Sequence, residues 1–151
     1  MPDAGPARGT PTPTQEDYLK AIWLCIQEKG YARVSDIADR LGLSYASVSR
    51  MIRRLHGEGL TTYVPYRGLN LTALGERRGR MLVERQNILA AWLAIMGMPS
   101  GAALERTVEG IEHHVGPEAL TQVEALLRYV EAHPRWWRRF RAWAEGEQPP
   151  P

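Results

Sequence analysis

Cysteine, lysine and long apolar runs are all scarce in this sequence of 151 residues. The one cysteine, Cys25, has no partner for an internal disulfide, and we expect a buried, inert thiol in a reducing cytoplasm. Because no apolar run reaches the length of a membrane span, the sequence predicts no membrane-spanning helix. Residues 1–13 are rich in proline, glycine and threonine and lack the apolar core of a signal peptide. We therefore expect a disordered arm in front of a cytoplasmic protein.

Signals for catalysis are also weak. The sequence has no His-Glu-x-x-His motif, no glycine-rich phosphate loop and no nucleophile elbow. A metallohydrolase is the weaker alternative, because His113 and His114 stand beside carboxylates but no other segment predicts a substrate pocket. With 44% hydrophobic residues, the chain can bury the core of one domain or of two small ones. We expect a binding protein and not an enzyme.

Residues 14–72 predict a winged helix-turn-helix domain. Thr14, Ser35 and Ser44 are placed to cap three successive helices at their N-termini. Two β-branched and aromatic runs follow, at 60–66 and 69–72, and a glycine turn between them indicates a hairpin. Three helices followed by a hairpin fit the docking geometry of a protein that reads the major groove of double-stranded DNA.

Positive charge is concentrated in the same region. Residues 44–72 hold four arginines and a single glutamate, although the whole chain has a net charge of only +2. Such a local excess is the expected footprint of phosphate contact. The residues predicted to approach base edges are Ser44, Tyr45 and Ser47. Those predicted to hold phosphates are Arg50, Arg53, Arg54, Tyr63, Tyr66 and Arg67. The alternative is a helical hairpin with a solvated basic face.

Residues 73–144 predict a second, all-helical domain, and residues 145–151 a disordered tail. A long helix is expected from Thr72 to about Met96, with three further helices behind it. The last of these carries aromatic residues at helical spacing, which we interpret as packing against the bundle or a second subunit, with base stacking as the alternative. They are Trp136, Trp137, Phe140 and Trp143. The predicted fold class is therefore mainly α.

The stretch Val108–His114 is the strongest candidate for a metal site. Glu109, Glu112 and His113 have the spacing i, i+3, i+4, which places two carboxylates and an imidazole on one face of a helix. An oxygen-rich set with one imidazole suits Mn²⁺, Fe²⁺ or Zn²⁺. The alternative is a solvated acidic helix face that binds no metal.

Three segments together give the chain a strong resemblance to the diphtheria-toxin-repressor family, specifically to its manganese transport regulator branch. They are residues 28–38, 66–72 and 108–114. The resemblance implies a homodimeric repressor that binds a palindromic operator near metal-uptake genes when Mn²⁺ is bound. It also implies a set of metal ligands drawn from several helices. The residues that match those ligands are Asp17, Glu109, Glu112 and His113.

Two positions depart from the family's ligand pattern. Lys20 stands where the family has a glutamate, and Gln86 stands where it has a histidine. Since a protonated lysine is a poor ligand and an amide offers only a neutral oxygen, we expect one metal per subunit and not two. Alternatively, the Lys20 ammonium replaces the cation and the protein binds DNA without metal. In the simplest interpretation, Lys20 pairs with Glu16 on the surface. A further alternative is a winged-helix regulator that responds to a small molecule or to no ligand.

Overall fold

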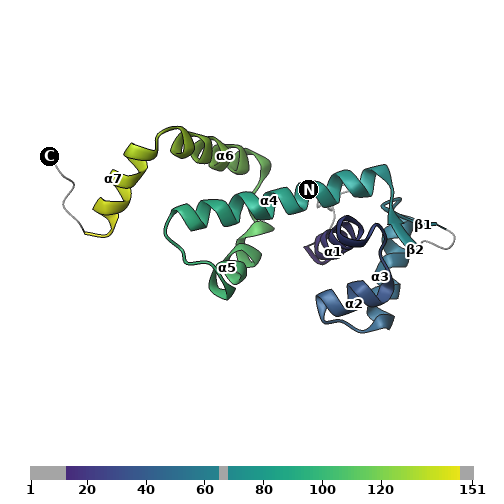
Figure 1. Cartoon of the computed structure of the whole chain (residues 1–151). Coiled ribbons are helices and arrows are strands. Elements are labelled where there is room, and N and C mark those ends of the chain that lie inside the picture. The colour runs from purple at the N-terminus through teal and green to yellow at the C-terminus, as the bar shows by residue number, and fades with distance from the viewer. Residues whose placement is uncertain (1–12, 65–67, 147–151) are drawn as a thin grey trace, which may run out of the picture. The chain divides into compact units, whose positions relative to one another are not determined.

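A computed structural model describes residues 13–64 and 68–146 of the chain, and this part consists of helices and one short hairpin (Figure 1). Its elements are α1 (Pro13–Lys29), α2 (Val34–Leu41), α3 (Tyr45–Gly57), β1 (Thr61–Val64), β2 (Gly68–Leu71), α4 (Ala73–Ile95), α5 (Ala102–Glu112), α6 (Pro117–Ala132) and α7 (Pro134–Ala144). The predicted fold class, mainly α with an N-terminal winged helix-turn-helix, is confirmed. Among these helices, none is both long and apolar enough to span a membrane.

The chain divides into two compact units within α4, between Val83 and Glu84. The boundary predicted from sequence lies at residue 72, where α4 begins. Of the predicted arm at 1–13, only Pro13 belongs to the described residues, and it begins α1. Of the predicted tail at 145–151, the structure describes residues 145–146 and no others.

The first unit is built around one apolar core, to which α1, α2, α3, β2 and α4 contribute buried side chains. Buried side chains of α1, α2, α3 and the hairpin pack together, and Leu82 of α4 joins them. Cys25 lies in this core with a free thiol, as predicted. Figure 1 shows α1, α2, α3 and the hairpin gathered beside the first half of α4. The long helix is therefore part of the folded core of this unit and not merely a linker.

Helix capping follows the sequence in part. Ser44 caps α3, because its Oγ accepts a hydrogen bond from the Ser47 N–H at 3.3 Å. The caps predicted at Thr14 and Ser35 are wrong, since both residues lie inside helices. The second helix begins after Arg33 because the carboxylate of Asp36, three residues on, accepts the Arg33 backbone N–H at 3.1 Å.

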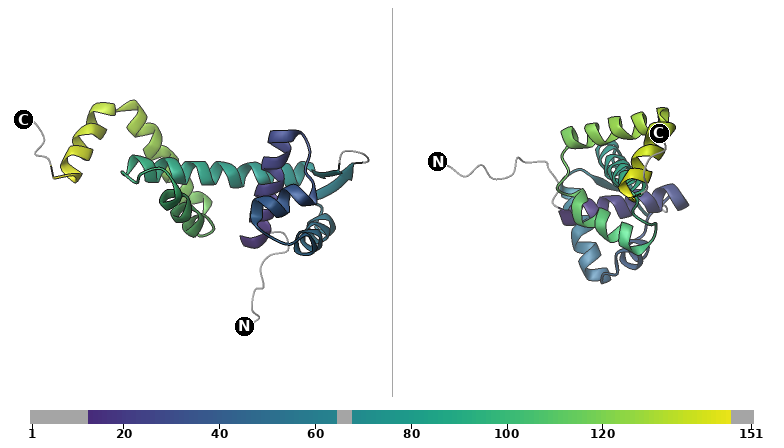
Figure 2. Two further views of the ribbon diagram at one scale, coloured as in Figure 1. Left: turned by 60° about the horizontal axis from the view of Figure 1, so that its bottom comes forward. Right: turned by 90° about the vertical axis from the view of Figure 1, so that its left-hand side faces the viewer.

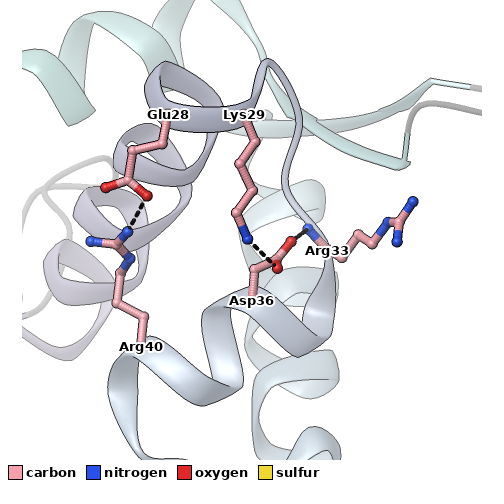
Figure 3. Close-up of polar contacts among 5 residues, drawn as sticks. All are labelled: Glu28, Lys29, Arg33, Asp36 and Arg40. Atoms are coloured by element: carbon pink, nitrogen blue, oxygen red, sulfur yellow. Dashed lines mark hydrogen bonds and ion pairs between the residues drawn. The ribbon is translucent and has the colours of Figure 1, made fainter.

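Two ion pairs join α1 to α2, and one of them lies within the segment 28–38 that carried the family resemblance (Figure 3). Lys29 Nζ lies 2.7 Å from Asp36 Oδ1, and Arg40 Nη2 lies 2.5 Å from Glu28 Oε2. The hydrogen bond from Lys29 holds the pKa of Asp36 below its ordinary value, and the Arg33 N–H lowers it further. The same bond raises the pKa of Lys29. The two ion pairs therefore connect the first two helices at the surface, beside their shared apolar core.

The hairpin is short and is tied to the core at one end. β1 and β2 are antiparallel, with Thr61 opposite Leu71 and Val64 opposite Gly68. Ala32, in the loop before α2, pairs with Leu69 through two backbone hydrogen bonds of 3.3 and 3.1 Å. Residues 65–67, between the strands, lie outside the described residues. The strands extend away from the three helices, as the left view of Figure 2 also shows.

The start of α4 packs closely on the rest of the first unit. Thr72 caps it, because its Oγ1 accepts the Gly75 N–H at 3.1 Å. A Cβ at Gly75 would lie 2.0 Å from the carbonyl oxygen of Leu60, and one at Gly79 would lie 2.8 Å from Trp23 Cβ. The two glycines, which weaken the sequence signal for a helix here, are therefore required by close packing.

The second unit buries fewer side chains than the first. Its buried apolar residues are Leu89, Val108 and Val130, among those described. α5 begins at Ala102 after Gly101. At the other end of this unit, Arg141 of α7 donates to the Met96 carbonyl at 2.7 Å, just beyond the last turn of α4.

The aromatic residues of α7 stack on one another and stay partly exposed. The ring of Phe140 lies 5.8 Å from that of Trp136 and 5.1 Å from that of Trp137, and Trp136 meets Tyr129 of α6 edge-on at 5.5 Å. Trp136 and Trp143 remain exposed. The contact with α6 agrees with the interpretation that these residues pack against the helical bundle.

Candidate nucleic-acid interface and metal centre

The N-terminal end of α3 presents the residues predicted to approach base edges. Ser44 and Tyr45 are exposed and Ser47 is partly buried. The hydroxyls of Ser44 and Ser47 lie 3.0 Å apart, so the cap holds both at the first turn. Turn residues that precede a helix of this kind are placed to enter a major groove.

A polar row on the α1 side of α3 is formed by Ser47, Arg50 and Arg54, at spacing i, i+3, i+7. Arg50 Nη2 donates to Ser47 Oγ at 3.4 Å. Arg50 also lies near Tyr18 of α1: burial raises the pKa of that phenol, and the guanidinium opposes the rise. Arg50 and Arg54 are both exposed, so the row carries two positive charges to the surface.

A second row, on the wing side of α3, is formed by Ser49, Arg53 and His56. With Ile52 and Tyr63 these residues line a hollow of about 320 Å³ between α3 and β1. His56 Nδ1 is held 2.8 Å from the Thr61 carbonyl oxygen. Sequence reasoning named Arg53 and Tyr63 and missed Ser49 and His56, although their spacing i, i+4, i+7 around Arg53 was a usable signal.

The wing contributes one described residue to the predicted interface. Tyr63 of β1 is exposed. The other two predicted wing residues, Tyr66 and Arg67, lie outside the described residues. Together with the two rows on α3, Tyr63 forms an exposed and mainly basic surface, which fits a phosphate backbone better than an apolar partner.

Glu58 is the one acidic residue of the segment 44–72, and sequence reasoning assigned it no role. It forms the C-cap of α3. Its carboxylate accepts from Gln15 Nε2 at 2.8 and 3.0 Å and from Arg54 Nε at 3.2 Å. This bond uses the Nε of Arg54, and the two terminal nitrogens of an arginine suit a phosphate.

The acidic motif on α5 separates into buried and exposed members. Glu112 is 0% exposed, whereas Glu109 is exposed. His113 forms the C-cap with helical backbone angles, and its Nε2 lies 3.7 Å from Glu112 Oε1. Burying a carboxylate is costly unless charges or hydrogen bonds compensate it. The pair Glu112 and His113 supplies an oxygen and an imidazole nitrogen side by side, a donor set that fits a divalent transition metal.

The remaining predicted ligands lie on α1 and α4. Lys20 Nζ is 3.9 Å from Asp17 Oδ1, and their side chains are 14% and 41% exposed. The low exposure of Lys20 disfavours the interpretation that it forms only a surface pair with Glu16. Gln86 is partly buried on α4. The structure thus places Asp17 with Lys20 in the first unit, and Glu112 with His113 in the second.

Comparisons with protein families match both units. A family described as "Iron dependent repressor, N-terminal DNA binding domain" matches residues 11–69. A second, described as "Iron dependent repressor, metal binding and dimerisation domain", matches residues 72–136. The two matches cover the three helices with the wing, and then α4 to α6 with the acidic motif. Both descriptions concern repressors and not enzymes, so the metallohydrolase alternative is set aside.

Solved structures of the same kind are similar to this chain. The manganese regulator SloR is 25% identical with a TM-score of 0.67, and the match covers 79% of this chain and 55% of SloR. IdeR of T. acidophilum is 26% identical with a TM-score of 0.64, covering 76% and 54%. ScaR, solved with bound Zn²⁺, is 26% identical with a TM-score of 0.64, covering 79% and 55%. The chain therefore spans about half the length of these relatives.

Proposed function

The chain belongs to the diphtheria-toxin-repressor family of iron-dependent repressors, and on that premise we propose that it is a metal-responsive regulator of transcription. It binds double-stranded DNA through α3 and the wing. The observation that carries this proposal is the exposed basic surface of α3. Ser44 and Tyr45 lie at its N-terminal end, and the arginines at 50, 53 and 54 lie further along the helix. Side chains at the start of the helix reach base edges, and the arginines hold phosphates on either side.

We propose one divalent metal ion per subunit, with Mn²⁺ favoured and Fe²⁺ or Zn²⁺ as alternatives. Its ligands are Asp17, Glu109, Glu112 and His113, with Gln86 or water completing the shell. Support comes from the buried carboxylate of Glu112 beside an imidazole, within the part matched by the metal-binding family. Manganese is favoured because similar proteins include a manganese regulator. When bound, the ion supplies positive charge that relieves repulsion among three carboxylates.

We propose that the protein is a homodimer and that its operator is palindromic. The second unit buries few apolar side chains for a folded helical unit, and a second copy would cover more of them. A two-fold dimer carries two identical α3 helices, so matching half-sites on DNA follow from its symmetry. Repression of metal-uptake genes is the regulatory role that suits such a sensor.

A bound metal ion would restrict the conformations available to the DNA-binding unit. Ligands from α1 and from α5 belong to different units, and a shared ion would hold α1 in one position relative to α5. Fewer conformations are then lost when the dimer binds its operator, so affinity rises without any contact between metal and DNA. The ion can raise operator affinity only by the ratio of its own affinities for the conformation that binds DNA and for the other conformations.

The ion pair between Lys20 and Asp17 favours one second candidate. In that case the ammonium of Lys20 occupies the place of a cation permanently, and the protein binds its operator without metal. The Lys20 ammonium would supply a positive charge beside the carboxylates, as a metal ion would, and a chelator cannot remove it. The two candidates therefore differ in metal dependence and not in DNA recognition.

The test is equilibrium dialysis of chelator-treated protein against Mn²⁺, with operator binding measured on the same samples. The proposal expects one bound Mn²⁺ per subunit and tighter operator binding at saturation. Lys20→Glu restores a fourth carboxylate and should raise Mn²⁺ affinity. If the wild type binds no Mn²⁺ and binds the operator, while Lys20→Glu acquires metal dependence, the second candidate holds. Operator binding that is indifferent to metal in both proteins would exclude the sensor.

A further inference from the structure

A buried glutamine on α1 is hydrogen-bonded to the carboxylate that ends the recognition helix α3. Gln15 is 2% exposed. Its Nε2 donates to both carboxylate oxygens of Glu58, at 2.8 and 3.0 Å. The same carboxylate accepts from Arg54 Nε at 3.2 Å. Two side chains, one from α1 and one from α3, thus donate to one carboxylate.

These bonds are directional, whereas the core that α1 shares with α3 is apolar. Apolar burial is non-directional and tolerates small rotations of one helix on another. An amide donating to a carboxylate is a charge-assisted bond, and a buried amide that loses its partner is destabilising. The position of Glu58 beside a phosphate-binding surface weakens DNA binding by charge alone. Its placement therefore indicates a positional role.

We propose that Gln15 and Glu58 are positioning residues that orient the recognition helix on the first turn of α1. Asp17, two residues after Gln15, lies on the same turn and is a ligand in the proposed metal site. A metal ion held by Asp17 would fix that turn, and the bonds from Gln15 to Glu58 would transmit its orientation to α3 and to the Arg54 guanidinium. This inference rests on the proposed function for its metal dependence, but the link itself exists without metal.

The experiment exchanges the amide of Gln15 and the carboxylate of Glu58 between the two positions. Gln15→Glu places two carboxylates against each other, Glu58→Gln leaves two amides that still form one bond, and the double variant restores amide to carboxylate with reversed polarity. Gln27→Glu is the control, because Gln27 is exposed on the same helix. A glutamate near the N-terminus of α1 interacts favourably with the helix dipole. Loss of function in Gln15→Glu therefore cannot come from an unfavourable charge at this end of the helix.

The first readout is hydrogen exchange of α3 amides in metal-free protein without DNA. Exchange in the last turn of α3 should be faster in Gln15→Glu and near wild type in the double variant and the control. The second readout is operator affinity in saturating Mn²⁺. Gln15→Glu should weaken it by about tenfold or more, since a charge-assisted hydrogen bond is lost. The double variant should recover most of that loss, and Glu58→Gln alone should show a smaller loss.

Two results would overturn the proposal: Gln15→Glu matching wild type in both readouts, or a folded double variant as impaired as Gln15→Glu. If circular dichroism shows that Gln15→Glu does not fold, Gln15→Met replaces it, because methionine keeps the volume and removes both bonds. It should then show the same faster exchange. Failure of the proposed function is distinguishable, since it would appear as wild-type operator binding without any response to Mn²⁺, while the exchange comparison still tests the link.

Discussion

Replacing Arg53 by alanine should weaken DNA binding in a way that depends on salt. Arg53 is exposed on the wing side of α3, where its Nε donates weakly to the Ser49 carbonyl at 3.4 Å. If it neutralises one phosphate, the slope of log affinity against log salt falls by about 0.9 when it is removed. Between 50 and 200 mM salt this contact accounts for a change of about 3.5-fold in affinity. The variant should therefore lose less affinity than wild type across that range.

The assay is fluorescence anisotropy with a labelled operator duplex, titrated at several salt concentrations in saturating Mn²⁺. Arg128→Ala is the matched control, because Arg128 is exposed on α6 in the other unit. The control should keep the wild-type slope. Equal slopes for Arg53→Ala and wild type, with affinity also unchanged, would refute the assignment of the α3 surface to DNA. A change of equal size in Arg128→Ala would show that the effect is one of net charge.

Two further predictions concern stability and pH. Gly75→Ala should destabilise the first unit by about 1–3 kcal/mol, because the added Cβ would lie 2.0 Å from the Leu60 carbonyl oxygen. Gly110→Ala lies in open space inside α5 and should stabilise the protein by about 0.5–1 kcal/mol. Urea unfolding measures both free energies, and an equal change in the two variants would contradict the close packing of α4. Asp36→Asn should reduce stability at neutral pH but not in acid. Lys29 lowers the pKa of the Asp36 carboxylate in the folded protein, so the ionised carboxylate stabilises the fold above the unfolded-state pKa of 3.8. This stabilisation is lost as the pH falls through the folded-state pKa. Unfolding measured from pH 2 to 7 should show the two proteins converging below pH 3.8, and a constant difference would contradict the ion pair.

Local signals in the sequence predicted much of the fold. Serine and threonine caps located the starts of α3 and α4 at Ser44 and Thr72. The cap at Ser35 is wrong because the helix begins earlier, at Val34, where the Asp36 carboxylate accepts the Arg33 backbone N–H. Gly75 was interpreted only as a weak helix former, since the sequence does not reveal that Leu60 packs against it.

The candidate site was predictable where it lies along one helix and not where it depends on packing. The spacing of the α5 motif grouped Glu109 with Glu112, but only the fold shows that Glu112 is buried and Glu109 exposed. The link from Gln15 to Glu58 joins residues 43 apart in the chain, so no periodicity could indicate it. For Lys20 the sequence offered a surface pair with Glu16, whereas the fold places its Nζ 3.9 Å from Asp17 Oδ1.

The most direct test of metal-controlled DNA binding is operator affinity measured across a Mn²⁺ titration of chelator-treated protein, for wild type, Glu112→Gln and Glu105→Gln. Glu105 is exposed on the same helix and serves as the matched control. The proposal predicts that Mn²⁺ tightens operator binding in wild type and in Glu105→Gln, and has no effect in Glu112→Gln. Operator affinity that rises equally with Mn²⁺ in all three proteins, or in none of them, would contradict it.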